Sequence, residues 1–123
     1  MDPISTAITA ALAAGFTQST VVEAYNGIKF LIKTKFGNNN DIISAIDRLE
    51  QRPHSNARQM ELQEQVEENH LDKNIDIVEV AEKLIKEMKA SGDEKHVMHA
   101  KGKGIAQANH GSTANVTLFV KDN

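Results

Sequence analysis

The chain has 123 residues, a formal net charge of −3 and no cysteine, and this length suits one domain of ordinary size. The lack of cysteine excludes disulfide bonds, thiolate zinc sites and cysteine nucleophiles. The negative charge gives no general attraction to nucleic acid, whose backbone requires clustered Lys and Arg, so we expect no nucleic-acid partner. Aromatic residues make up only 4% of the chain, which predicts an aliphatic core.

The N-terminal segment 3–22 contains no Lys, Arg, Asp or Glu. Within it, Ile4, Ile8 and Leu12 follow one face of a helix that we expect to end at Gly15. The many hydroxyl and amide side chains make the segment too polar for a constitutive membrane span. Two interpretations stay open: a helix of small residues buried in a bundle, or a helix that acts on membranes under particular conditions.

Apolar residues at helical spacing continue along the chain and predict four more helices. We expect them over residues 19–36, 41–51 and 56–69, and between turns at 72–74 and 91–92, with Ser19 as a helix N-cap. The helix at 56–69 is rich in Glu and Gln, which is typical of a solvated face. The expected fold class is therefore all-α: a bundle of about four to five helices over residues 1–92, joined by short loops.

The pattern changes after residue 92. Residues 93–104 are charged and end in glycines, which is typical of a linker. Residues 105–121 alternate with period two and predict two short strands, about 105–109 and 115–120. Their uncharged, proline-free composition suits either a cross-β stack or a hairpin that completes a closed sheet. The residues expected to drive this assembly are Ile105, Gln107, Asn109, Gly111, Asn115, Val116 and Leu118.

No group of residues in the sequence indicates catalysis. His96 and His99 would share one face of a helix, but spacing fixes no third ligand, so we expect no metal site. The run at 102–104, Gly-Lys-Gly, lacks the spacing of a phosphate-binding P-loop. We therefore expect neither an enzyme nor a cofactor.

The first eight residues, MDPISTAI, resemble the N-termini of fungal HeLo-type cell-death domains and of their bacterial helical counterparts, the Bell domains. In those proteins a helical bundle precedes a short C-terminal amyloid signalling motif. Residues 104–111, GIAQANHG, with 115–117, NVT, are similar to such a RHIM-like motif. The resemblance implies that the tail assembles with itself, or with an NLR-like receptor that carries a similar motif. It further implies that the N-terminal helix, through Ile4, Ile8 and Leu12, then acts on a membrane.

The sequence thus favours a signalling or cell-death effector, for example one that acts in bacterial immunity. We expect such an effector to be cytoplasmic and to associate with a membrane on activation. The alternative is a soluble oligomerising adaptor with a closed β-tail interface and no membrane activity. A third interpretation is a small regulatory protein that binds another protein through the acidic helix at 56–69.

Overall fold

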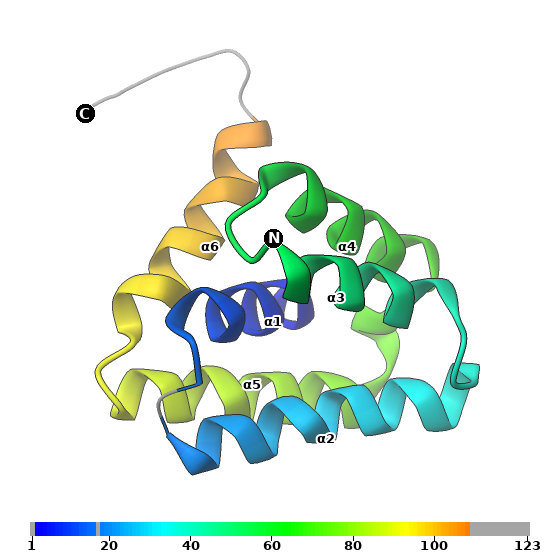
Figure 1. Cartoon of the computed structure of the whole chain (residues 1–123), viewed down its shortest axis with the longest axis horizontal. Coiled ribbons are helices and arrows are strands. Elements are labelled where there is room, and N and C mark those ends of the chain that lie inside the picture. The colour runs from blue at the N-terminus through cyan, green and yellow to red at the C-terminus, as the bar shows by residue number, and fades with distance from the viewer. Residues whose placement is uncertain (1, 17, 109–123) are drawn as a thin grey trace.

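The computed structural model describes residues 2–16 and 18–108, with side chains up to residue 101. Within these ranges the chain is all-α, as predicted, and contains no strand (Figure 1). The elements are α1 (Pro3–Ala14), α2 (Ser19–Phe36), α3 (Asp41–Gln51), α4 (Asn56–Glu68), the short 3-10 helix η1 (Leu71–Lys73), α5 (Ile75–Ala90) and α6 (Glu94–Ala108).

Polar side chains cap the first turn of four helices, which explains where these helices begin. Carboxylate or amide oxygens of Asp2, Asn40 and Asn74 accept hydrogen bonds from backbone N–H groups at 2.8, 2.8 and 3.1 Å, starting α1, α3 and α5. Ser55 Oγ does the same for α4 at 3.3 Å. The predicted cap at Ser19 is wrong by one position, because α2 begins at that residue and the preceding Gln18 makes no side-chain cap.

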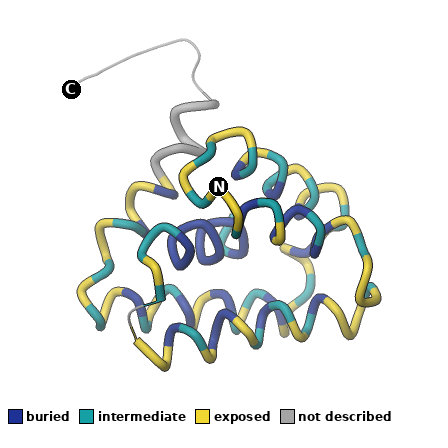
Figure 2. Tube along the Cα trace, in the orientation of Figure 1, coloured by how far each residue is buried: buried dark blue, intermediate teal, exposed yellow. Residues whose placement is uncertain are grey.

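The first helix lies at the centre of the bundle. α1 contacts each of α2, α3, α4, α5 and α6. Nine consecutive residues, Ile4–Leu12, are buried, and Figure 2 shows this stretch as the continuous dark segment inside the fold. A helix that is apolar or small on every side can be enclosed by neighbours, and α1 has no charged side chain that would require water.

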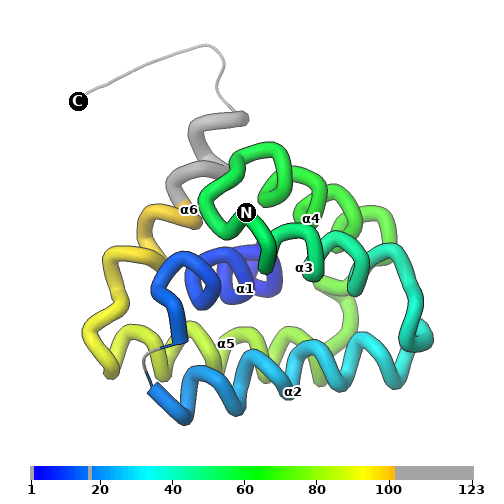
Figure 3. Tube along the Cα trace, in the orientation of Figure 1, coloured from blue at the N-terminus to red at the C-terminus, as the bar shows by residue number. Residues whose placement is uncertain are grey.

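The outer helices pack around α1 and around one another. α2 and α5 lie side by side along one edge of the bundle (Figure 3). Gly27 on α2 faces Val80 on α5, where an added Cβ would lie 3.5 Å from Val80 Cγ1. The same aliphatic cluster continues through all six α-helices of the described residues, with Val97 and Ala100 as the contribution of α6.

The predicted linker at 93–104 is wrong, because residues 94–108 form α6. Val97 and Ala100, 0% and 1% exposed, pack into the core, and α6 contacts α1 and α5. Tertiary packing therefore stabilises a helix that its glycines alone would not favour. The predicted strand at 105–109 is also wrong over 105–108, which belong to α6. Residue 109 and the second predicted strand, at 115–120, lie outside the described residues.

Candidate functional site at the central helix

The three residues predicted for membrane action lie together in the core. Ile4 and Ile8 are 0% exposed and Leu12 is 7% exposed. Each side chain contributes to the one aliphatic cluster that joins α1 to the surrounding helices. None of the helices in the described part of the chain is long and apolar enough to cross a membrane.

The central helix also buries hydroxyl groups. Ser5, Thr6 and Thr9 are at most 3% exposed. Ser5 Oγ and Thr9 Oγ1 have no hydrogen-bond partner among the described residues. A buried polar group without a partner lowers the stability of the folded state by about 1–3 kcal/mol. These two hydroxyls therefore make the packing of α1 inside the bundle less stable.

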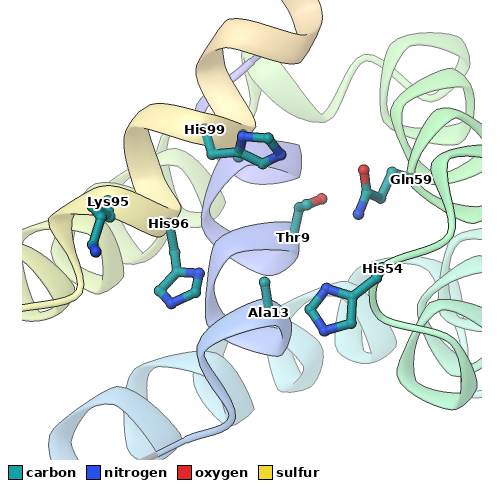
Figure 4. Close-up of a pocket in the computed structure, with 8 residues that line it drawn as sticks. Thr9, Ala13, His54, Gln59, Lys95, His96 and His99 are labelled. Carbon is teal, nitrogen blue, oxygen red and sulfur yellow. The ribbon is translucent and has the colours of Figure 1, made fainter.

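A cavity of about 560 Å³ lies beside the C-terminal half of α1. Figure 4 shows Thr9 and Ala13 on α1 facing residues from three other parts of the fold. The lining residues are Thr9, Ala13, His54, Gln59, Lys95, His96, His99 and Ala100. Gln59, 3% exposed, donates from Nε2 to the carbonyl oxygen of Pro53 at 2.9 Å, which ties α4 to the loop that carries His54.

The cavity brings together three histidines that are distant in sequence. His96 and His99 come from α6, within the stretch that was predicted to be a linker, whereas His54 comes from the loop between α3 and α4. No sequence pattern indicates that His54 joins them, because their proximity depends on how α6 packs against α1. No three His, Cys, Asp or Glu residues in the described ranges form a group that could hold a metal ion.

Two polar clusters fix the helices around α1. Tyr25 Oη and Lys29 Nζ on α2 donate to Glu50 Oε2 on α3, at 2.5 and 2.8 Å. Burial alone would raise the pKa of Glu50, but the hydrogen bonds from Lys29 and Tyr25 outweigh it and hold that pKa below its ordinary value. Burial, followed by the bond to Glu50, raises the pKa of Tyr25 well above its usual range. The Tyr25 ring also packs on Phe16, with centroids 4.8 Å apart.

The second cluster joins α3 to α4. Arg48 Nε donates to Glu61 Oε1 at 3.0 Å, and Arg48 Nη2 makes a second bond to Glu61 Oε2. These hydrogen bonds lower the pKa of the Glu61 carboxyl and raise the pKa of the Arg48 guanidinium. Part of the acidic face of α4 is therefore paired within the bundle.

The structure describes little of the segment that was predicted to drive assembly. Ile105 and Gln107 belong to the last turns of α6, where side chains are not described. Asn109, Gly111, Asn115, Val116 and Leu118 lie beyond the described residues. Their role in assembly stays a prediction.

The described residues form an all-α bundle that encloses an N-terminal helix without charged side chains. Residues 1–122 match the Het-E N-terminal domain family, and the chain belongs to that family. It is therefore a domain of the cell-death and heterokaryon-incompatibility signalling type. No curated protein and no solved structure shows significant similarity to it. A bacterial Bell domain and a RHIM-like tail stay predictions.

Proposed function

We propose that this protein is a non-enzymatic cell-death effector in which α1 leaves the bundle and acts on a membrane after the C-terminal segment assembles. The single observation that carries the proposal is the combination found in α1: no charged side chain and nine consecutive buried residues. A surface helix needs neither property. Both properties suit a helix that exchanges a protein interior for a lipid interface, since an unpaired charge is costly in either environment.

Release of α1 requires a trigger because it exposes apolar surface. Each large aliphatic side chain, such as Ile4 or Ile8, contributes about 1.5–3 kcal/mol when buried. A membrane interface restores that contribution, whereas water does not. The unpartnered hydroxyls of Ser5 and Thr9 lower the cost of leaving, since neither loses a hydrogen bond made within the described residues.

The length of α1 indicates how it would act. Its 12 residues extend about 18 Å, and the hydrocarbon layer is about 30 Å thick. One copy of α1 therefore lies in the interface rather than across it, and several copies are needed to disturb a bilayer. Assembly through residues 105–121, with other copies or with an NLR-like receptor that carries a similar motif, would supply that local concentration.

A charge placed on α1 tests the membrane step. Ala13 is half-buried beside the cavity, so a longer side chain fits there without entering the core. We expect Ala13→Glu in the full chain to reduce dye leakage from vesicles about tenfold relative to Ala13→Gln, because the carboxylate resists transfer into the apolar part of the interface. Ala57→Glu, at an exposed position of α4, controls for net charge. Equal leakage by the two Ala13 variants would contradict the proposal.

A proline in the tail tests the assembly step. Asn115→Pro removes a backbone donor from the predicted β segment, and Asp122→Pro is the matched control outside it. We expect seedable, thioflavin-positive filaments from the wild type and the control but not from Asn115→Pro. A fixed-mass oligomer without filaments would contradict filament assembly through the tail and would favour the adaptor.

A structural observation also favours the alternative function, a soluble adaptor with a closed β-tail interface. α1 contacts all five other α-helices of the described chain, so its departure removes the partner that they share. In an adaptor, α1 would remain in the core and only the tail would join other chains. Tail-dependent assembly without vesicle leakage is the result expected for this second function.

A further inference from the structure

We propose that the cavity beside α1 is a binding site for a phosphate monoester, held by Thr9, His54, His96 and His99. The proposal rests on the cavity itself and not on the membrane action of α1. Among the described residues, its lining contains no Asp or Glu, although the chain has 17 acidic residues and a net negative charge. The acidic residues that begin the α6 region, Asp93 and Glu94, are not among the lining residues.

The donors come from three different parts of the fold and lie around the cavity, which suits an anion with several acceptor oxygens. Thr9 lies on α1, His54 on the α3–α4 loop, and His96 and His99 on α6 (Figure 4). A tetrahedral phosphate accepts hydrogen bonds from all of these sides, and an imidazole ring can donate one through a ring N–H. Lys95 lies at the outer side of the group and adds positive charge at the rim.

Thr9 supplies the buried donor. It is 3% exposed, and its Oγ1 has no hydrogen-bond partner in the described structure although the residue lines the cavity. A hydroxyl in this position costs stability unless a ligand or a water molecule in the cavity forms a hydrogen bond with it. Ser5, one turn earlier on α1, has an equally unpartnered hydroxyl but does not line the cavity, so it provides an internal comparison.

The size and the opening of the cavity indicate an organic phosphate. A volume of about 560 Å³ falls within the range of about 300–1,000 Å³ found for small-molecule sites. Inorganic phosphate alone would leave most of that space to water. His54 and His99 are exposed, so a ligand can enter from solvent, and the ligand can be a soluble ester or the headgroup of a lipid.

Calorimetry measures binding of glycerol 3-phosphate to the full chain. Sedimentation measures binding of the full chain to phosphatidylcholine vesicles that contain either phosphatidic acid or phosphatidylserine. We expect saturable binding of glycerol 3-phosphate, of phosphatidic acid vesicles, or of both, and the arm that binds identifies the source. Binding of neither would overturn the proposal. So would measurable binding that is equally strong for the two anionic vesicles while glycerol 3-phosphate does not bind, since phosphatidylserine has the charge without the monoester.

Paired variants separate the site from its structural surroundings. Thr9→Val should raise the melting temperature of the ligand-free protein and weaken binding about tenfold, the loss of one hydrogen bond to a charged group. Ser5→Ala should also raise the melting temperature and leave the affinity unchanged. Equal affinities of the two variants would overturn the assignment of Thr9.

A second pair covers the case in which Thr9→Val fails to fold. His99→Gln, at an exposed position, should weaken binding severalfold, while Lys86→Gln on α5 removes a surface cation outside the cavity and should not. A loss of affinity as large for Lys86→Gln as for His99→Gln would mean attraction to general surface charge and would overturn the proposal.

Discussion

The carboxylate of Glu50 accepts hydrogen bonds from two side chains of α2, so its charge state affects the packing of α3. Its pKa lies below the ordinary 4.5, which means that the unfolded chain binds this proton more readily than the folded one. The stabilisation is therefore present above about pH 4.5 and is lost as the pH falls through the lowered pKa.

We expect Glu50→Gln to lower the free energy of unfolding by about 1 kcal/mol at neutral pH and by less at pH ~3. Urea unfolding of both proteins at the two pH values measures this difference. Glu82→Gln, at an exposed position of α5, is the control and should change little at either pH. A deficit in Glu50→Gln that is the same at both pH values would contradict a role for the carboxylate charge.

Substitution of glycine by alanine should have opposite effects on stability at two positions. Gly15 ends α1 with φ +85°, a region that costs an L-residue about 1 kcal/mol, and its N–H donates to the carbonyl oxygen of Ala11 at 3.1 Å. Gly27 lies inside α2, where a Cβ would make ordinary contact with Val80. We expect Gly15→Ala to destabilise by about 1 kcal/mol and Gly27→Ala to stabilise by up to about 1 kcal/mol. Thermal unfolding distinguishes the two signs.

Local chemistry made several residue-scale features predictable. Gly15, Ser55 and Asn74 act through their own backbone or the next turn, so the sequence near them was enough to place helix ends. The grouping of His54 with His96 and His99 depends on packing between distant segments, and no local pattern contains that information.

At the scale of the helix, α1 tolerates little change in volume because it is packed on every side. We expect Ile8→Val to cost about 1 kcal/mol, and Ile8→Ala about 2–5 kcal/mol. Ile75→Val, the same change at a side chain that is 72% exposed, should stay within about 0.5 kcal/mol. Chemical unfolding of the three variants checks the ranking, and similar values for Ile8→Val and Ile75→Val would contradict the central position of α1.

α6 shows where sequence patterns fail at this scale. Up to residue 101, its apolar contribution to the core consists of Val97 and Ala100, too few to predict an amphipathic helix, and glycines at 102 and 104 argue against one. The helix forms because α1 and α5 offer a surface for it. The five earlier helices carry longer apolar stripes, and their ends matched the structure within about one residue of the expected positions.

At the scale of the whole molecule, the bundle depends on one shared partner. We expect a fragment of residues 18–108, which lacks α1, to keep helical signal in circular dichroism but to lose the cooperative unfolding transition. Its control is the full chain measured under the same conditions. A cooperative transition in the fragment would mean that α2–α6 form a core without α1, so that α1 can leave while the rest of the bundle stays folded.

The position of α1 also has a consequence for synthesis. α1 leaves the ribosome before every helix that buries it, and α6, which completes its surroundings, is made last among the described elements. At about 5–20 residues per second, this apolar segment remains without its packing partners for several seconds. During each round of translation the nascent chain therefore presents the same surface that the finished bundle hides, and a chaperone that shields it would protect both the protein and nearby membranes.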